Sequence, residues 1–235
     1  MRNCIIIGHR GANGLAPENT LLSYRTAMKI GVDMIELDVH QTIDGHLVCI
    51  HDYAVDRTTD GTGNVAEMTL KELRQLDAGQ NEIIPLLSEV LDFTYGKVSV
   101  NIELKVLDIE KQVTNLIRQK RMKDQVIVSS FLHGSLQRIH EIDPEVKIAV
   151  LTNVQIDNMI EYVKSLHGIA LNPLYKMVTS ELIFQAHNHH IQLYPWTINE
   201  PEMMVEYANM GVDGIITDFP NMAVEILDAL ISHSD

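Results

Sequence analysis

Three side chains that could do acid–base or metal chemistry stand near one another in the early part of the chain. Glu36 and Asp38 alternate with apolar residues, and His51 follows a short distance downstream. Residues two apart on a β-strand point to the same face, so the two carboxylates would be neighbours. Adjacent carboxylates repel each other unless a cation or a shared proton relieves the repulsion. The pattern therefore predicts a metal ion or a proton-sharing pair beside an imidazole.

A β-hairpin would bring the imidazole to the carboxylates. The dipeptide Asp44-Gly45 separates two apolar runs, and it accepts the positive φ angles of a tight turn. If these two residues form the whole loop, Ile43 faces His46 across the turn. Counting back along both arms then places Asp38 opposite His51.

Apolar strand-like runs and amphipathic helical runs alternate along the rest of the chain. One helix is predicted from Leu21 to Ile30, with Asn19 or Thr20 as its N-cap and Gly31 as its stop signal. Apolar strands separated by helices predict a parallel sheet, and eight repeats predict closure into a (β/α)8 TIM barrel. The strands are expected at residues 5–8, around 36–38, and at 98–104, 125–129, 147–151, 169–171, 192–195 and 214–217.

The composition suits one α/β domain and excludes some classes of partner. No linker divides the chain, so residues 1–235 are expected to form a single barrel domain, with a hairpin and insertion at about residues 40–85 after the second strand. The net charge of −14 argues against nucleic-acid binding and against stable docking on an anionic membrane. Cys4 and Cys49 lie in apolar runs and are expected to be buried free thiols. The apolar run at residues 4–7 is too short for a signal core, so a cytoplasmic location is the default expectation.

In a barrel of this kind the active site lies at the C-terminal ends of the strands, so the polar residues there are the candidates. The third strand carries Glu103 and Lys105 on one face, and Glu103 would join Glu36 and Asp38 in a set of three carboxylates. Oxygen-only ligands suit a hard cation such as Mg²⁺ or Ca²⁺. The alternative is a set of salt-bridged barrel carboxylates, with Lys105 and Arg10 as their partners.

Two histidines are placed beside this set, because His9 ends the first strand and His51 ends the hairpin. A pair of imidazoles at one site can divide the general acid and general base roles near neutral pH. Arg10 and Lys105 are cations in an acidic chain, and beside a metal they would hold the oxygens of a phosphate. Three further histidines are expected to form a solvated helix end, favoured by the helix dipole, rather than a metal site: His187, His189 and His190.

Two aromatic side chains also follow predicted strands. Trp196 is the only tryptophan of the chain, and it is expected to form an apolar wall for the carbon skeleton of a substrate. The alternative for Trp196 is ordinary core packing. Phe131 has a similar but weaker case for a place at the substrate.

Eight short motifs follow one another from the N-terminus almost to the C-terminus. They are His9-Arg-Gly11, Pro17-Glu-Asn-Thr20, Glu36-Leu-Asp38, His51-Asp52, Asp56-Arg-Thr-Thr59, Asn101-Ile-Glu-Leu-Lys105, Trp196-Thr-Ile-Asn199 and Gly211-Val-Asp-Gly-Ile-Ile-Thr-Asp218. Each motif alone would be weak. In this order, and over nearly the whole chain, they resemble the glycerophosphodiester phosphodiesterase family.

The resemblance implies a (β/α)8 barrel with a small insertion, and metal-dependent hydrolysis of glycerophosphodiesters to glycerol 3-phosphate and an alcohol. The substrates of the family include glycerophosphocholine and glycerophosphoethanolamine. The roles that it implies are Mg²⁺ or Ca²⁺ binding by Glu36, Asp38 and Glu103, acid–base catalysis by His9 and His51, and phosphate binding by Arg10 and Lys105.

Three alternatives stay open beside this interpretation. A lysophospholipase D type of enzyme would carry an apolar rim around the mouth, for which Tyr53, Val55 and Leu86 are the candidates. A catalytically silent barrel that binds phosphodiesters would lack a histidine or a carboxylate, and none is missing. A barrel enzyme with Lys105 as a Schiff-base amine is disfavoured, because neighbouring carboxylates raise the pKa of a lysine. The sequence predicts neither the head group nor the oligomeric state.

Overall fold

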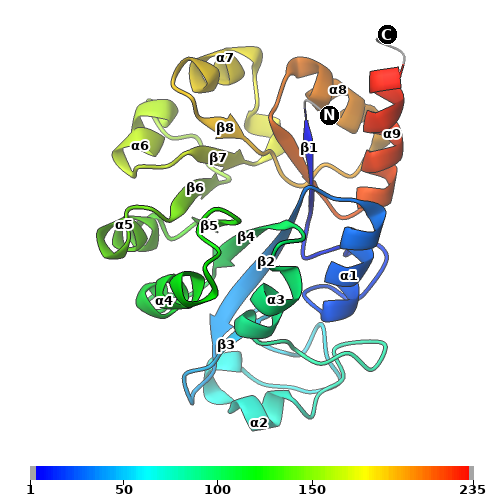
Figure 1. Cartoon of the computed structure of the whole chain (residues 1–235), viewed down its shortest axis with the longest axis vertical. Helices are drawn as coiled ribbons and strands as arrows, with labels where there is room; N and C mark the ends of the chain where they lie inside the picture. The colour runs from blue at the N-terminus through cyan, green and yellow to red at the C-terminus, as the bar shows by residue number, and fades with distance from the viewer. Residues whose placement is uncertain (1–3, 233–235) are drawn as a thin grey trace.

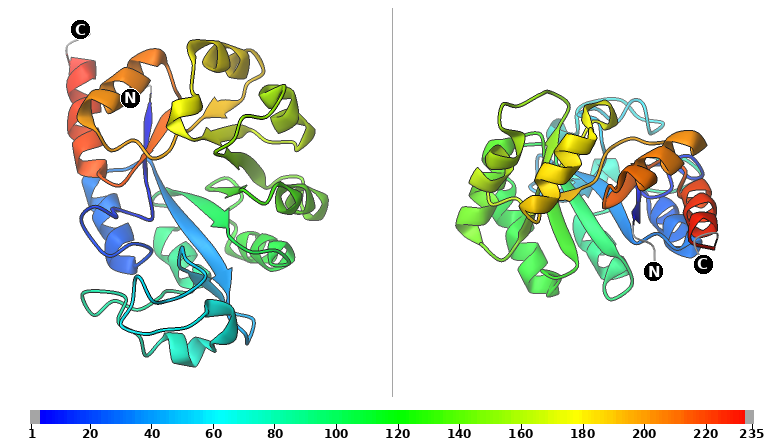
Figure 2. Two further views of the ribbon diagram at one scale, coloured as in Figure 1. Left: turned by 180° about the vertical axis from the view of Figure 1, so that it is seen from behind. Right: turned by 90° about the horizontal axis from the view of Figure 1, so that it is seen from above.

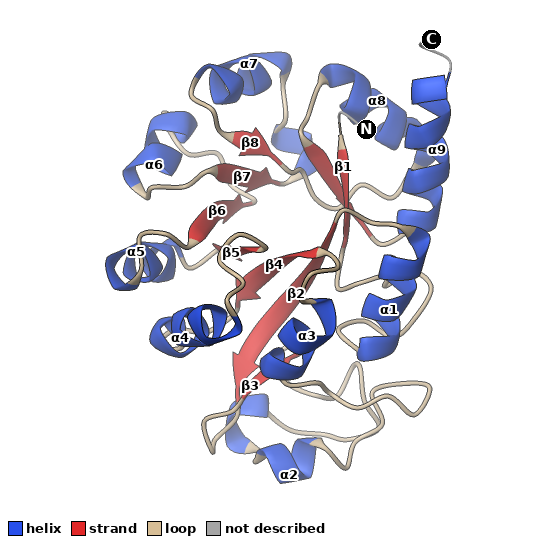
Figure 3. Cartoon of the chain, in the orientation of Figure 1, coloured by secondary structure: helices blue, strands red, loops and turns tan. Residues whose placement is uncertain are grey.

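Eight parallel strands form the wall of a barrel, and the helices lie outside it (Figures 1 and 3). The computed structural model describes residues 4–232. Around the wall the strand order is β8-β7-β6-β5-β4-β2-β1-β9, while the ninth strand, β3, pairs antiparallel with β2. The wall strands are β1 Ile5–Gly8, β2 Met34–Gln41, β4 Ser99–Leu104, β5 Val126–Ser130, β6 Lys147–Thr152, β7 Ala170–Pro173, β8 Gln192–Leu193 and β9 Gly214–Thr217.

Backbone hydrogen bonds between the segment of β8 and β9 close the wall. Asp213 N–H donates to Leu193 O at 3.1 Å, and Ile216 N–H donates to Pro195 O at 3.0 Å. The predicted (β/α)8 barrel is therefore confirmed. Its strands are buried on both faces, which explains why they appear in the sequence as continuous apolar runs.

The helices follow the strands in turn and cover the outside of the barrel, as the views from behind and from above show (Figure 2). Residues 153–158 form a loop, so the helix after β6 begins only at Met159. Among the described residues, no helix combines the length and the apolar character of a membrane span. The helices are α1 Leu21–Ile30, α3 Leu87–Thr94, α4 Glu110–Lys120, α5 His133–Ile142, α6 Met159–Ser165, α7 Ser180–Asn188, α8 Pro201–Met210 and α9 Pro220–Ser232.

The boundaries of α1 match the prediction, and a side-chain cap explains the N-terminal one. Thr20 Oγ1 accepts a hydrogen bond from Ser23 N–H, and Gly31 ends the helix at a φ of 94°. We expect Thr20→Ala to lower the free energy of unfolding by about 1 kcal/mol, because Ser23 N–H loses its acceptor. Urea denaturation measures the change, with exposed Thr62→Ala as the matched control. Equal stability of the two variants would contradict the capping role.

The insertion between β2 and α3 has a small apolar core of its own. It contains β3 Leu47–Cys49, the short 3₁₀ helix η1 Val65–Glu67 and the single-turn helix α2 Leu70–Leu73. Val55 is fully buried in this core, and Leu86 packs against it. Val55 is therefore excluded as a candidate for the apolar rim of a lysophospholipase D, because this side chain packs inside the insertion.

The hairpin register differs by one residue from the expected one. Val39 pairs with Cys49, so Asp38 lies opposite Ile50, and Ile50 N–H donates to Asp38 O at 3.1 Å. The loop has three residues instead of two, because Thr42 closes it by backbone and side-chain hydrogen bonds.

Thr42 N–H donates to His46 O at 3.0 Å, and Thr42 Oγ1 accepts from His46 N–H at 2.9 Å. Gly45 takes the left-handed position of the loop at a φ of 82°, as three-residue hairpin loops require. Ile43 therefore does not face His46. His51 lies beyond the end of β3 and reaches the barrel mouth from the segment after the strand.

Candidate active site

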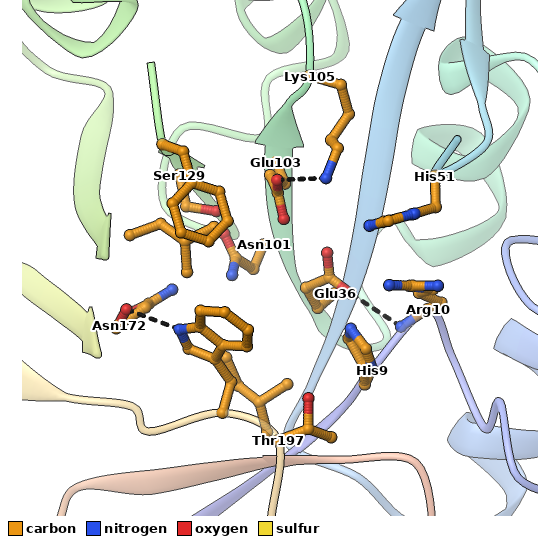
Figure 4. A pocket seen from close by; sticks show the side chains of 14 residues that line it. His9, Arg10, Glu36, His51, Asn101, Glu103, Lys105, Ser129, Asn172 and Thr197 are labelled. Atoms are coloured by element: carbon orange, nitrogen blue, oxygen red, sulfur yellow. Dashed lines mark hydrogen bonds and ion pairs between the residues drawn. The ribbon is translucent and has the colours of Figure 1, made fainter. Parts of the chain in front are cut away.

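A cavity of about 140 Å³ opens among the C-terminal ends of the barrel strands. Its lining includes eight of the nine residues that the sequence singles out for the site, the exception being Asp38, which is only 1% exposed. Figure 4 shows histidines and cations on one side of this pocket and uncharged polar side chains on the other. The eight lining residues are His9, Arg10, Glu36, His51, Glu103, Lys105, Phe131 and Trp196.

Three buried carboxylates meet beside the pocket, as the strand alternation predicts. Asp38 on β2 lies directly beside Glu103 on β4 in the parallel ladder, and Glu36 points to the same face as Asp38. One oxygen from each of the three lies within 4.8 Å of the others. Oxygen ligands at this spacing can hold a hard divalent cation.

The electrostatics of the cluster also fit a cation. Burial raises the pKa of Glu36 well above its ordinary value, and the charges of Asp38 and Glu103 add to the effect. Burial and the charge of Asp38 raise the pKa of Glu103 to about 7. Among the described residues, Glu36 Oε1 has no hydrogen-bond partner. A cation would offset the repulsion between the carboxylates and would also give Glu36 Oε1 a ligand bond. A shared proton would offset only part of the repulsion.

Two cations already reach the carboxylates, as the salt-bridge alternative expected. Lys105 Nζ lies 2.7 Å from Glu103 Oε1 and 3.4 Å from Asp38 Oδ1. Burial alone would lower the pKa of Lys105, but Asp38 and Glu103 outweigh it and raise this pKa. A protonated Lys105 is a poor Schiff-base amine, which removes support from that alternative.

Arg10 spans the cluster and the rim of the pocket. Its backbone N–H donates to Glu36 Oε2 at 2.8 Å, and its Nε lies 3.3 Å from Asp38 Oδ2. Its Nη1 donates to Glu18 Oε1 at 2.7 Å. The side chain is held at two points and the backbone at a third, and Arg10 lines the cavity where an anion would bind.

Each of the two site histidines is backed by a carboxylate. His51 Nδ1 lies 2.5 Å from Asp52 Oδ1, and His9 Nδ1 lies 2.6 Å from Asp218 Oδ1. A carboxylate only accepts hydrogen bonds, so these contacts place a proton on Nδ1 and leave Nε2 to face the pocket. Figure 4 shows both rings extending into the pocket.

The two carboxylate partners have different surroundings. Asp52 accepts from Arg57 Nε at 2.6 Å, and these hydrogen bonds hold the pKa of Asp52 well below its ordinary value. Asp218 accepts from the amide of Asn199 at 2.7 Å. Burial alone would raise the pKa of Asp218, but the hydrogen bond from His9 contributes to lowering it. Burial lowers the pKa of His51, which favours its neutral form.

The sequence did not single out these supporting residues. Asp52 and Asp218 belong to quoted motifs, but no role was expected for them. Asn101, Ser129 and Asn172 also line the pocket, and no role was predicted for them. Strand alternation could have indicated Asn101, which lies two residues before Glu103 on the same face of β4.

Trp196 and Phe131 lie together on the pocket wall. Their rings meet edge to face with centroids 5.5 Å apart, and Trp196 Nε1 donates to Asn172 O at 2.9 Å. They offer apolar surface to a bound molecule. The histidines at the end of α7 are exposed, as predicted. Among the described residues, the carboxylate cluster is the only group of side chains whose spacing could hold a metal ion.

Comparison with known proteins decides the family. A sequence model of the glycerophosphoryl diester phosphodiesterase family matches residues 9–222. The chain belongs to this family. The membership and the enzyme class predicted from the motifs are thereby confirmed.

Individual relatives agree with the family model. The glycerophosphodiester phosphodiesterase of Caldanaerobacter subterraneus subsp. tengcongensis is 38% identical over 95% of this chain and 97% of its own length. The glycerophosphodiester phosphodiesterase of Bacillus altitudinis is also 38% identical, over 96% of this chain and 98% of its own length.

Solved structures of relatives share the fold. The crystal structure of glycerophosphodiester phosphodiesterase from Agrobacterium tumefaciens matches with a TM-score of 0.85 at 30% identity, over 94% of this chain and 99% of its own. An Oleispira antarctica phosphodiesterase in complex with the product sn-glycerol-3-phosphate matches with a TM-score of 0.88 at 28% identity. The match covers 95% of this chain and 96% of that one.

Proposed function

We propose that this protein hydrolyses glycerophosphodiesters to glycerol 3-phosphate and an alcohol, with a divalent cation and two histidines at one site. The observation that carries the proposal is the pocket itself. Two imidazoles, each backed by a carboxylate, share it with a buried carboxylate cluster and two cationic side chains. The product bound to the Oleispira antarctica relative supports a small-molecule substrate of this kind.

Glu36, Asp38 and Glu103 would hold the cation, and their oxygen-only donor set favours Mg²⁺ or Ca²⁺. When bound, such an ion supplies Lewis acidity at a phosphate oxygen and fixes the orientation of the substrate. Lys105 and Arg10 would then turn from the carboxylates, which the ion neutralises, toward the oxygens of the phosphate.

His9 and His51 would divide the proton transfers. One Nε2 accepts the proton of the nucleophile as its oxygen bonds to phosphorus, and the other donates a proton to the alkoxide as the P–O bond breaks. Asp52 and Asp218 would hold a proton on Nδ1 of each ring, so the base would act as the neutral imidazole and the acid as the imidazolium, which gives up its Nε2 proton. Two nucleophiles fit the arrangement, namely water and a neighbouring glycerol hydroxyl that would form a cyclic phosphate.

The decisive experiment is a coupled assay for glycerol 3-phosphate on a panel of glycerophosphodiesters. We expect release from at least one substrate, loss of turnover with EDTA and recovery when Mg²⁺ or Ca²⁺ is added back, because the carboxylates repel each other without a cation. Full activity in EDTA would contradict the metal role. No release with any metal would favour the catalytically silent barrel.

One observation favours lysophospholipids as a second substrate class. Large apolar side chains are exposed in the loops after β4, β5 and β6, at Leu107, Phe131 and Val154. Tyr53 in the insertion is also exposed, and its hydroxyl donates to Lys105 O at 3.1 Å beside the pocket. These residues form more of an apolar rim than the sequence predicts.

A comparison of hydrolysis rates distinguishes the two substrate classes. We expect glycerophosphocholine to be hydrolysed faster than lysophosphatidylcholine, since the exposed apolar side chains come singly from four separate loops rather than from one apolar surface. Choline release from both substrates, below the micelle concentration of the lipid, measures the ratio. Activity on the lipid alone would reverse the order of the two proposals.

The buried free thiols of Cys4 and Cys49 support the predicted cytoplasmic location, where thiols stay reduced.

A further inference from the structure

The half of the pocket opposite the histidines carries no charged side chain. Figure 4 shows Asn172, Ser129 and Asn101 on one side, facing His9 and His51 on the other. These three residues come from three different strands, β7, β5 and β4. The other uncharged residues that line the pocket are Phe131, Leu151, Trp196, Thr197 and Ile216.

The polar atoms of this half are buried and unpartnered. Asn101, Ser129 and Asn172 are each at most 2% exposed. Within the part of the chain that the structure describes, no hydrogen-bond partner is found for Asn101 Oδ1, for Ser129 Oγ, or for either side-chain atom of Asn172. Buried polar groups in native proteins are nearly always paired, so a concentration of four such atoms on one pocket wall indicates a ligand.

The chemistry of the wall selects the kind of ligand. Amides and a hydroxyl both donate and accept hydrogen bonds, as a hydroxyl group of a ligand does. A phosphate would need cations or backbone N–H groups, and this half offers no cationic side chain. A quaternary ammonium group cannot hydrogen bond at all, so it would leave all four atoms unpartnered.

We propose that Asn101, Ser129 and Asn172 form a hydroxyl-binding subsite for the glycerol part of the substrate, with the apolar residues beside them packing on its carbon skeleton. This inference rests on the proposed function. The phosphate then lies between the two halves, near Arg10 and Lys105, and the variable alcohol extends toward the open mouth. The subsite thus recognises the part of the substrate that all glycerophosphodiesters share.

Binding of small anions tests the subsite without any turnover. The probes are glycerol 3-phosphate, ethyl phosphate, which keeps the phosphate but lacks both hydroxyls, and phosphocholine. Calorimetric titration in the presence of Mg²⁺ compares the wild type with Ser129→Ala and Asn172→Leu. Asn101 is left unchanged because it lies two residues from Glu103 on the same strand.

We expect the wild type to bind glycerol 3-phosphate at least about tenfold more tightly than ethyl phosphate, since a lost hydrogen bond to a buried group costs roughly that factor. Each variant should lose about tenfold for glycerol 3-phosphate and keep its affinity for ethyl phosphate. Thr114→Val is the matched control, because Thr114 Oγ1 is an equally buried and unpartnered hydroxyl on α4, outside the pocket.

Three results would overturn the subsite. They are equal affinity of the wild type for glycerol 3-phosphate and ethyl phosphate, a variant that weakens all the anions alike, and a variant that weakens phosphocholine instead of glycerol 3-phosphate. Ser129→Ala removes one oxygen only, so it decides the matter even where Asn172→Leu fails to fold. A wild type with the expected preference but no hydrolysis of any diester would refute the proposed function and support the subsite.

Discussion

His51→Ala and His9→Ala are each expected to lower kcat by at least about 100-fold while the barrel stays folded. Among the described residues, His9 and His51 are the only histidines that line the pocket, so no third imidazole can replace the proton transfer of either ring. The rings are partly exposed and outside the apolar core, and their loss should leave the thermal unfolding temperature nearly unchanged. The coupled glycerol 3-phosphate assay and thermal melting measure the two effects.

His46→Ala is the matched control for both variants. His46 lies at the tip of the hairpin, with its side chain 47% exposed, and it does not line the pocket. Its replacement should leave kcat close to that of the wild type. If His9→Ala or His51→Ala also keeps near-full turnover, the catalytic role of that histidine is refuted, whatever its position in the pocket.

The metal-free protein is expected to lose stability as the pH rises from about 5 to 8. Burial raises the pKa of Glu36 well above its ordinary value and that of Glu103 to about 7, so the folded state binds their protons more tightly than the unfolded state does. The stabilising contribution is complete below the ordinary glutamate pKa of about 4.3 and is lost as the pH rises through the raised values. The lowered pKa values of His40 and His51 act in the opposite direction below about pH 6.5, and that of Asp38 below about pH 4, so the loss of stability is expected chiefly above pH 6.5.

Glu36→Gln separates the carboxylate repulsion from other causes of this pH dependence. The amide removes one buried charge and keeps an acceptor for Arg10 N–H, so the metal-free variant should be more stable than the wild type at pH 8. Mg²⁺ or Ca²⁺ should raise the unfolding temperature of the wild type at pH 8 and that of the variant much less.

Thermal melting in EDTA and in each metal, at pH 5 and at pH 8, measures these differences. Glu206→Gln is the control, since Glu206 is exposed on α8. Equal metal-induced stabilisation of Glu36→Gln and the wild type would exclude Glu36 as a ligand. A variant less stable than the wild type in EDTA at pH 8 would show that Glu36 is not under repulsive strain.

Hydrogen bonds through Arg57 connect Asp52, the partner of His51, with Glu18, the partner of Arg10. Arg57 donates to both Asp52 and Glu18, and Glu18 accepts from Arg10. The orientation of His51 and of the Arg10 guanidinium therefore depends on one surface-exposed arginine of the insertion. This network is a second connection of the insertion to the site, in addition to His51 itself.

The sequence by itself was sufficient to predict the barrel fold and the convergence of the three carboxylates. Both follow from local rules, because the period of a strand decides that Glu36 and Asp38 share a face, and parallel strands place their C-terminal ends at one edge. The cap at Thr20 and the stop at Gly31 are local too, which is why the bounds of α1 were predicted without error.

Only the tertiary structure decided the hairpin register, the burial of Val55 and the neutral half of the pocket. The register depends on how Thr42 bonds across the loop, and the burial of Val55 depends on which residues the insertion gathers into its core. Asn101, Ser129 and Asn172 look like ordinary polar residues of separate strands, and they face one space only because the wall closes. No spacing in the sequence marks such uncharged polar residues as a group. Their shared role depends on side chains that lie far apart along the chain and meet only in the folded protein.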